Sequence, residues 1–280
     1  LADLTMLKTL YLNNNDKLGD LKPLEGLTQL ETLYLNDTPV SDIRPLAGMS
    51  NLQLLKLRNT QVEDIDALSG LTQLRYLSLG NTQVADVAAV SGMTQLTILE
   101  LENTPIRDAT ALVDLTQLMT LNLSGTEVSD ISGLAGLGSL LTLDLSRTGV
   151  SDLSPLTDLV KLTRLDLNST HVEEIGNLSG LSGLTHLEVS EAQVNDVSAL
   201  EGLTELVYLD LAWNQISAID SLSNLTKVRH LNLAGNQISD PTALANLMEL
   251  WYLDVSENPI SDITPFTGLD NLGKLHISAA

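Results

Sequence analysis

A pattern of apolar and turn residues repeats along this chain with a period of 22 residues. From Leu27 it reads L-T-x-L-x-x-L-x-L-x-x-T-x-V-x-D-I-x-x-L-x-G, and a 23-residue unit from Leu4 precedes it. The repeats begin at Leu27, Met49, Leu71, Met93, Leu115, Leu137, Leu159, Leu181, Leu203, Leu225, Leu247 and Leu269. A fixed period of this length indicates a solenoid of stacked structural units. We therefore predict one solenoid over residues 1–280, with about twelve full repeats and a final partial one.

Each repeat contains a short strand with one buried face. Leu33 and Leu35 alternate with outward-facing positions, and Val40, Ile43 and Leu46 bring the chain back inward on the opposite side. One repeat cannot bury these side chains alone, whereas stacked repeats pair their strands in parallel about 4.8 Å apart. The predicted fold class is α/β, with a parallel sheet on the concave face and short helical or irregular segments on the convex face.

Several repeats carry phrases typical of a known family. The chain reads L-T at 225–226, N-Q-I-S-D at 236–240 and N-P-I-S-D-I-T-P at 258–265. These phrases resemble the leucine-rich-repeat family and, within it, the 22-residue class of bacterial internalins. The resemblance implies a non-enzymatic protein-binding module that recognises a protein partner through its concave face. It also implies an extracellular setting, as part of a bacterial surface or secreted protein.

Composition and charge exclude several classes of function. The chain has no cysteine, 36 acidic residues against 14 basic ones, and a net charge of −22. Nucleic acid is therefore not an expected partner, and no apolar stretch predicts membrane insertion. His186 and His230 lie two repeats apart, roughly 10 Å, which is too far to share a metal directly. We expect no catalytic residues, no metal site and no cofactor.

An acidic column lies just before the convex segments. Its members are Asp42, Asp64, Asp86, Asp108, Asp130, Asp152, Glu174, Asp196, Asp240 and Asp262, with Ala218 as the one interruption. One carboxylate per repeat is too sparse for a ladder of calcium sites. An Asp at this place can instead accept hydrogen bonds from the free N–H groups of the following turn. We predict that the column caps the convex turns.

A second column departs from the family pattern, in which Asn forms a ladder along the solenoid. It reads Asn15, Thr38, Thr60, Thr82, Thr104, Thr126, Thr148, Thr170, Ala192, Asn214, Asn236 and Asn258. A Thr hydroxyl has a shorter reach than an Asn amide. We expect a tighter turn through the Thr repeats and a local defect at Ala192.

The outward-facing positions of the strands gather acids in the C-terminal half. Asp144, Asp166, Glu188 and Asp210 occupy consecutive repeats, where like charges repel one another. Since the fold gives no evident reason for them, they predict a protein partner with a basic patch. Beside them, on the same face, lie Arg164, His186, Tyr208, His230 and Tyr252. The alternative is that Arg164 and Lys274 neutralise these acids.

Aromatic residues favour a binding surface. Only Phe266 occupies a core position, whereas five tyrosines point from the concave strands and Trp251 and Trp213 lie at a strand start and just past a strand end. Exposed Tyr and Trp offer large contact area and a polar tip. The alternative is that these tyrosines pack as cross-strand filler. The predicted partner-binding residues are Tyr208, Tyr252, Trp251, Trp213, His186, His230, Arg164, Asp144, Asp166, Glu188 and Asp210.

Two other functions fit the pattern. The sequence shows no evident terminal caps, so solenoids could self-associate end to end into filaments. The repeat is also similar to that of a eukaryotic phosphatase regulator, which would imply an intracellular regulatory subunit. Identity of the partner, source organism and oligomeric state do not follow from the residues.

Overall fold

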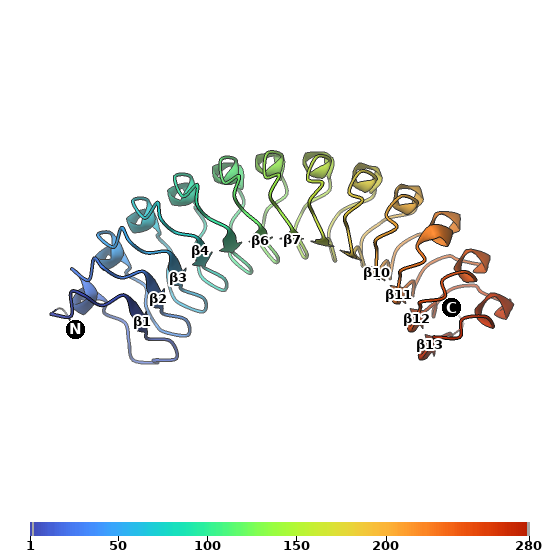
Figure 1. Ribbon diagram of the computed structural model, residues 1–280, viewed down its shortest axis with the longest axis horizontal. Coiled ribbons are helices and arrows are strands. Elements are labelled where there is room, and N and C mark those ends of the chain that lie inside the picture. The colour runs from blue at the N-terminus through green and yellow to red at the C-terminus, as the bar shows by residue number, and fades with distance from the viewer. Residues whose placement is uncertain (2, 279–280) are drawn as a thin grey trace. The chain divides into compact units, whose positions relative to one another are not determined.

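The computed structural model describes residues 1 and 3–278. The chain divides into two compact units, residues 1–140 and residues 141–280, which we describe separately. In both units a short 3-10 helix follows each strand, except the last strand of the chain (Figure 1). This succession confirms the predicted leucine-rich-repeat solenoid. The assignment of residues 1–280 to one domain stays a prediction.

Unit 1 contains the first six strands of the chain. They pair in parallel and in sequence order, from β1 with β2 to β5 with β6. The strands are β1 (Thr9–Tyr11), β2 (Thr32–Tyr34), β3 (Leu54–Lys56), β4 (Tyr76–Ser78), β5 (Ile98–Glu100) and β6 (Thr120–Asn122). The 3-10 helices are η1 (Lys22–Leu24), η2 (Arg44–Leu46), η3 (Asp66–Leu68), η4 (Ala88–Val90), η5 (Thr110–Leu112) and η6 (Ser132–Leu134).

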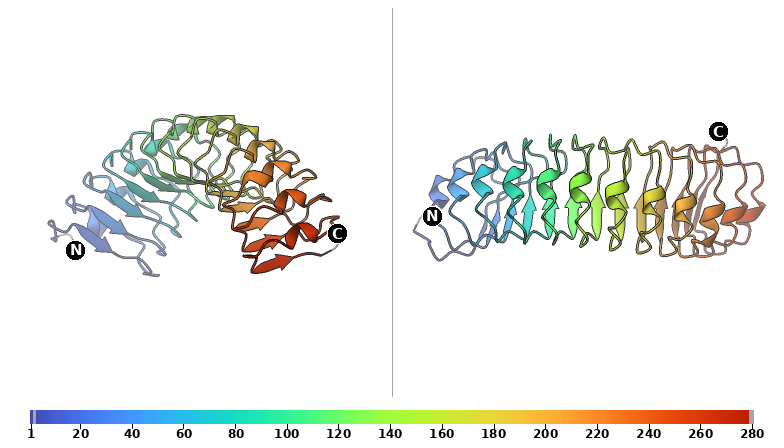
Figure 2. Two further views of the ribbon diagram at one scale, coloured as in Figure 1. Left: turned by 45° about the vertical axis from the view of Figure 1, so that its right-hand side comes forward. Right: turned by 90° about the horizontal axis from the view of Figure 1, so that it is seen from above.

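Unit 2 follows the same plan, and Figure 2 shows its strands side by side. They too pair in parallel and in sequence order, from β7 with β8 to β12 with β13. The strands are β7 (Thr142–Asp144), β8 (Arg164–Asp166), β9 (His186–Glu188), β10 (Tyr208–Asp210), β11 (His230–Asn232), β12 (Tyr252–Asp254) and β13 (Lys274–His276). The 3-10 helices are η7 (Ser154–Leu156), η8 (Gly176–Leu178), η9 (Ser198–Leu200), η10 (Asp220–Asn224), η11 (Thr242–Leu244) and η12 (Thr264–Phe266).

The central leucine of each strand fixes the register of the sheet. In β10 the central Leu209 is fully buried, and it pairs with Leu187 on one side and Leu231 on the other. Successive side chains of a strand point to opposite faces, so the two residues flanking each central leucine point outward. In this way the 22-residue period aligns like positions of neighbouring repeats into rows on the strand face.

The Thr and Asn ladder positions bond differently. Thr148 Oγ1 donates to the carbonyl of Leu145 in its own repeat, at 2.6 Å. Asn236 Nδ2 donates both to Leu233 O in its own repeat, at 3.0 Å, and to Leu211 O in the preceding one, at 2.9 Å. The shorter reach of Thr is confirmed. The predicted tighter turn is wrong, because the residue before the ladder position has a φ near +56° in a Thr repeat (Arg147) and in an Asn repeat (Trp213) alike.

The expected defect at Ala192 is partly filled by its neighbour. Asn214 Nδ2 donates to Val189 O at 2.6 Å, and Asn214 Oδ1 accepts from Val194 N at 3.0 Å. Both groups belong to the Ala192 repeat. Ala192 itself has no side-chain amide. The hydrogen bond that an Asn at this position would donate to Leu167 O in the preceding repeat is therefore missing.

Ala192→Asn should therefore raise the free energy of unfolding by about 1 kcal/mol, because the new amide could add bonds to Leu167 O and Val189 O. Urea denaturation measures the change. Ala192→Thr is the matched control, since a hydroxyl reaches only Val189 O. An Asn variant no more stable than the Thr variant would show that the turn cannot use the amide.

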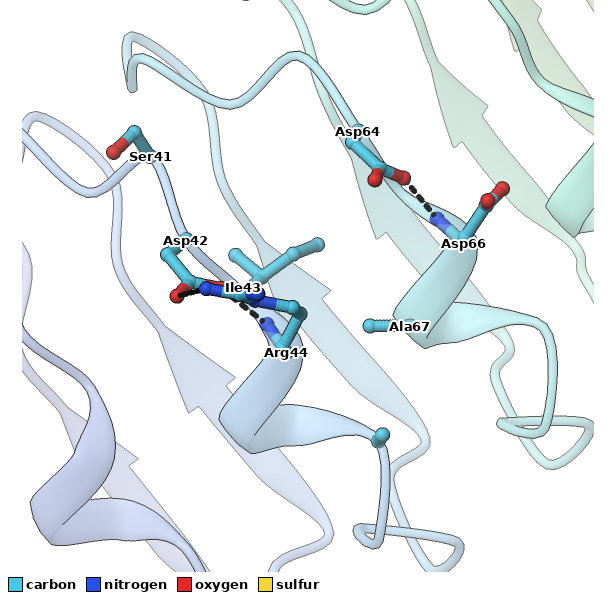
Figure 3. A pocket seen from close by; sticks show the side chains of 8 residues that line it. Ser41, Asp42, Ile43, Arg44, Asp64, Asp66 and Ala67 are labelled. Carbon is cyan, nitrogen blue, oxygen red and sulfur yellow. Dashed lines mark hydrogen bonds and ion pairs between the residues drawn. The ribbon is translucent and has the colours of Figure 1, made fainter.

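The aspartates of the convex column cap the 3-10 helices, as predicted, whereas Glu174 makes no such bond among the described residues. Asp42 Oδ1 accepts from Arg44 N at 3.0 Å, and Asp64 Oδ1 accepts from Asp66 N at 2.8 Å (Figure 3). The same bond, from the backbone N–H two residues on, is made by Asp86, Asp108, Asp130, Asp152, Asp196, Asp240 and Asp262. Within residues 1 and 3–278, no group of three acidic or histidine side chains is placed to hold a metal ion.

These hydrogen bonds favour the charged carboxylate. The backbone N–H of Ser132 is the main cause that lowers the pKa of Asp130 from its usual value. For Asp42 the side chain of Arg44 acts first, and the pKa falls to about 2. A capping carboxylate with a lowered pKa stabilises the fold above its unfolded pKa, and this contribution is lost as the pH falls through the folded value.

Asp130→Ala should lower the melting temperature at neutral pH by on the order of 2 °C, since the cap of η6 is lost. Asp130→Asn, which keeps the accepting oxygen, should lower it less. Calcium or a chelator should leave the melting temperature of the unaltered protein unchanged. A rise of several degrees on adding calcium would mean that the column binds metal.

Candidate functional site

Two rows of side chains lie next to each other on the strand face of unit 2. The aromatic row consists of His186, Tyr208, His230 and Tyr252, at the first positions of β9 to β12. The acid row consists of Asp144, Asp166, Glu188 and Asp210, at the last positions of β7 to β10. The parallel register brings the members of each row onto neighbouring strands. The two rows overlap along β9 and β10.

The rings of the aromatic row stack on one another. Ring centroids are 5.9 Å apart for His186 and Tyr208, 4.3 Å for Tyr208 and His230, and 4.2 Å for His230 and Tyr252, with interplanar angles of at most 14°. These separations are close to the spacing of paired strands. His276, from the other outward position of β13, continues the series at a tilted 41°. The stacked ring faces therefore contact one another within the row.

Stacking leaves the edges of these rings toward solvent. All four side chains are half-buried, and the Tyr252 hydroxyl makes a long hydrogen bond to Asp254 Oδ2, at 3.4 Å. The row thus presents an apolar strip edged by hydroxyls and ring nitrogens. Cross-strand packing, the alternative considered from the sequence, describes the contacts within the row. It leaves the outer edges available to a partner.

The partial neutralisation considered for Arg164 and Lys274 involves no direct ion pair among the described residues. Arg164 is exposed and lies within 4.0 Å of none of the described carboxylates. Lys274 Nζ lies 5.3 Å from the ring centroid of Trp251, as a cation over an indole. The carboxylates of the acid row therefore have no ion-pair partner among the described residues.

Three members of the acid row have a structural task that the sequence prediction missed. Asp144 accepts from Ser146 N, Asp166 from Asn168 N, and Asp210 from Ala212 N, each at 2.9 Å. An Asp at the end of a strand can bind the backbone two residues on and so start a turn. The view that nothing in the fold uses these acids is wrong. In Asp166 this bond uses Oδ1 and leaves Oδ2 for other partners.

Burial and mutual repulsion change the titration of this face. Burial is the main cause that raises the pKa of Asp166 to about 6, and the charges of Asp144, Glu188 and Asp210 raise it further. Burial, with Glu188 and Asp210, raises the pKa of Tyr208 to about 12. Burial lowers the pKa of His230. Near neutral pH the stacked rings thus favour the uncharged form, and within the acid row Asp166 is ionised against an energetic cost.

Asp166→Asn should stabilise the protein at pH 8 by about 1 kcal/mol, a figure reduced because the carboxyl is only half-buried. The raised pKa means that the folded state binds the proton more tightly than the unfolded state does. The charge of Asp166 therefore reduces stability as the pH rises from about 4 through about 6. The benefit should vanish near pH 4. Urea denaturation at both pH values measures it, and an Asn variant that is less stable at pH 8 would contradict this account.

A small hollow lies where the rows begin. It has a volume of about 110 Å³ and is lined by side chains of β7, β8 and β9, among them Asp144, Arg164, Asp166, His186 and Glu188. A volume of this size holds a side-chain tip rather than a substrate molecule. It places a cation and three acids within one strip of the surface.

The structure separates the two tryptophans that the sequence prediction grouped with these rows. Trp251 directly precedes β12, whereas Trp213 lies three residues past the end of β10, so they occupy opposite edges of the parallel strands. They are 53% and 56% exposed. Trp213 has a φ of +56°, a left-handed conformation that a bulky side chain rarely adopts and that costs about 1–3 kcal/mol.

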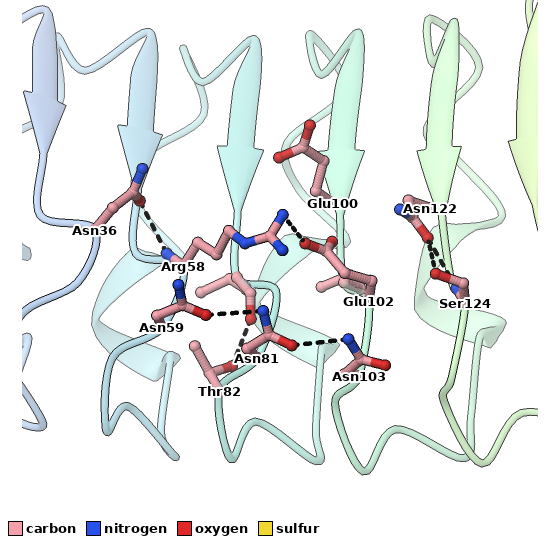
Figure 4. Close-up of polar contacts among 12 residues, drawn as sticks. Asn36, Arg58, Asn59, Asn81, Thr82, Glu100, Glu102, Asn103, Asn122 and Ser124 are labelled. Carbon is pink, nitrogen blue, oxygen red and sulfur yellow. Dashed lines mark hydrogen bonds and ion pairs between the residues drawn. The ribbon is translucent and has the colours of Figure 1, made fainter.

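Unit 1 has polar features that the sequence prediction did not single out. The residues before the ladder position form a surface chain of side-chain hydrogen bonds. Asn59 donates to Asp37 at 2.6 Å, and Figure 4 shows the next two bonds, from Asn81 to Asn59 and from Asn103 to Asn81, each at 2.8 Å. Arg58 reaches across two repeats to the buried carboxylate of Glu102, at 2.7 Å. The recurrence of Asn just before the ladder position, in Asn59, Asn81 and Asn103, is the sequence signal that could have identified this chain of hydrogen bonds.

Unit 1 also carries a separate aromatic group on its strand face. Tyr11 and Tyr34 stack with centroids 4.7 Å apart, and Lys56 Nζ lies 5.5 Å from the Tyr34 ring and 4.5 Å from the Tyr76 ring. The Tyr76 hydroxyl donates to Glu100 at 2.9 Å. This group serves below as the natural control for the aromatic row of unit 2.

Comparison with known proteins agrees with this architecture. A model described as leucine-rich repeat region matches residues 91–277, and one described as leucine-rich repeats in two copies matches residues 5–48 and 50–92. The chain belongs to the leucine-rich-repeat family. Among curated proteins no sequence matches it.

Solved structures place these leucine-rich repeats among internalin-like domains. An internalin (inlF) from Listeria monocytogenes is 33% identical, with a TM-score of 0.96 over 98% of this chain and 82% of that one. An internalin C2 from the same species is also 33% identical, with a TM-score of 0.56 over 76% of this chain and 83% of that one. The plant peptide hormone receptor RGFR1, solved in complex with RGF2, shares the fold at 23% identity and a TM-score of 0.86, over 99% of this chain and 48% of that one.

Internalin-like leucine-rich-repeat domains are typically protein-binding modules and are usually non-catalytic. In the part of the chain that the structure describes, no helix is long and apolar enough to cross a membrane.

Proposed function

We propose that this leucine-rich-repeat domain is a non-enzymatic binding module whose unit 2 recognises a protein partner through its strand face. The supporting observation is the aromatic row beside the acid row. A continuous strip of stacked rings offers apolar contact area that is already ordered, so binding loses little side-chain entropy. Tyr208 lies within the strip and Tyr252 at its end, and both supply the polar edges typical of interface hot spots.

The acid row points to the charge of the partner. Asp144, Asp166, Glu188 and Asp210 lie on four neighbouring strands, and none of them forms an ion pair within the described chain. Their field would attract a basic patch and speed association, an effect that added salt would screen. The partner we propose is therefore a protein with a basic surface. The likeness to internalins of Listeria monocytogenes supports a bacterial surface or secreted setting.

Affinity capture with three matched baits tests the proposal. The unaltered chain should retain a protein that the double variant Tyr208→Ala, Tyr252→Ala does not retain. The control bait Tyr34→Ala, altered only in unit 1, should retain it as the unaltered chain does. Equal capture by all three baits would place recognition elsewhere on the molecule.

A further inference from the structure

Trp213 occupies a position where the turn does not call for an aromatic residue. The corresponding position in other repeats is held mainly by Asn, Asp and Gly, among them Asn81, Asp37 and Gly125, which tolerate the left-handed conformation. Trp213 adopts the same conformation with its indole 56% exposed. Since the left-handed conformation recurs at this position from repeat to repeat, the exposed apolar ring is what distinguishes Trp213, and such a ring offers contact area to a partner.

The repeat that follows is shaped to receive this indole. Gly235 holds the corresponding position there, with a φ of +66°, and a methyl group on it would overlap the six-membered ring of Trp213. The ring therefore lies closely against the backbone at Gly235 and has its open side toward solvent. We call this pair the Trp213–Gly235 seat.

The chain already shows how a second indole of this kind is used. Trp251 lies against Gly273, where a methyl group would overlap its five-membered ring, and Lys274 Nζ lies 5.3 Å from the ring centroid of Trp251. An indole lying on a glycine thus receives a cation within this protein. The described residues place no cation within such range of Trp213.

Carboxylates flank the Trp213–Gly235 seat along the same row of positions. Glu191 holds this position one repeat before Trp213, and Glu257 holds it one repeat after Gly235. Both are exposed. Glu191 Oε2 accepts a hydrogen bond from Ser169 at 2.8 Å, and Glu257 Oε1 accepts one from Ser278 at 3.3 Å, which leaves each a second oxygen. An exposed indole face with carboxylates on both sides along the same row favours a cationic group.

We propose that the Trp213–Gly235 seat binds an arginine side chain of the protein partner, at the edge where the strands end. A planar guanidinium can stack on the indole, and the negative charges of Glu191 and Glu257 further along the row add attraction for its positive charge. Lysine lacks this planar fork and binds more weakly there. The inference rests on the proposed function only in that the arginine belongs to a partner protein. It adds a contact outside the aromatic row.

Because the chain has only two tryptophans, single-tryptophan variants can report on each indole separately. In the variant Trp251→Phe all indole fluorescence comes from Trp213. A capped tetra-arginine peptide should change that fluorescence saturably, and at least fivefold more tightly than tetra-lysine. A tetra-citrulline peptide, nearly isosteric but neutral, should cause no change. The variant Trp213→Phe, which reports Trp251, should respond to tetra-arginine at least fivefold more weakly.

Removal of the flanking charges completes the test. Adding Glu191→Gln and Glu257→Gln to the Trp251→Phe protein should weaken tetra-arginine binding at least fivefold, with the melting temperature retained. Adding Glu63→Gln and Glu173→Gln, which removes the same charge from other exposed positions, should leave it within twofold. Equal loss in both variants, or an equal response of the two tryptophans, would mean diffuse attraction by the net charge and would overturn the proposal. Since the probe is a short peptide, the result is independent of whether the aromatic row binds a protein.

Discussion

Tyr208→Ala is expected to weaken binding of the protein partner by about 2 kcal/mol, roughly thirtyfold. Tyr208 stacks between His186 and His230, with centroids 5.9 Å and 4.3 Å away, so its removal interrupts the apolar strip in the middle. It also removes a hydroxyl from the edge that faces solvent. Calorimetric titration with the captured partner measures the loss of affinity. We expect this loss to arise mainly from faster dissociation of the complex.

The same substitution should change stability only slightly, because the Tyr208 side chain is half-buried on the strand face and lies outside the leucine core. Aromatic contacts of this kind contribute about 0.5–1.5 kcal/mol. Tyr34→Ala is the matched control, since Tyr34 stacks with Tyr11 on the strand face of unit 1, and it should leave affinity unchanged. If Tyr208→Ala unfolds the protein while its folded fraction binds normally, the aromatic row is sheet packing alone.

Leu209→Ala, one residue further along β10, should show the opposite behaviour. Leu209 is fully buried between Leu187 and Leu231 in the leucine core, so alanine there leaves a cavity. Such a substitution costs about 2–5 kcal/mol of unfolding free energy. Urea denaturation should show this loss, whereas affinity measured well below the transition should stay within about twofold. A cost under about 1 kcal/mol would mean that the repeats are not held by this row of leucines.

The repeat period is enough to predict the fold, because every structural element is tied to one position of the 22-residue pattern. The strand at Tyr208–Asp210 and the capping by Asp130 both follow from spacing and side-chain chemistry. The ladder is predicted correctly as to reach and wrongly as to turn shape, since the left-handed residue before it fixes the turn irrespective of Thr or Asn.

The candidate site was predictable only in part. Periodicity places His186, Tyr208, His230 and Tyr252 in one row, but the near-parallel stacking of their rings depends on side-chain torsions that a pattern does not contain. The turn-forming role of Asp166 was visible in principle, because Asp commonly binds the backbone N–H two residues on.

The two tryptophans show another feature that could be predicted from the sequence only in part. A sequence shows that Trp213 and Trp251 are near strand ends, and counting from Tyr208–Asp210 and Tyr252–Asp254 puts them on opposite edges. Their close contact with Gly235 and Gly273 requires the backbone of the next repeat to be in place. The glycines alone were no signal, since glycine recurs in many turns of this chain.

Tyrosine-directed footprinting of the partner complex tests the central claim most directly, because each unit carries tyrosines on its strands. Modification of Tyr208 and Tyr252 should fall at least fivefold when the partner is bound, whereas modification of Tyr11, Tyr34 and Tyr76 should stay within twofold. Protection of the unit 1 tyrosines with unchanged modification of Tyr208 and Tyr252 would contradict recognition through the strand face of unit 2.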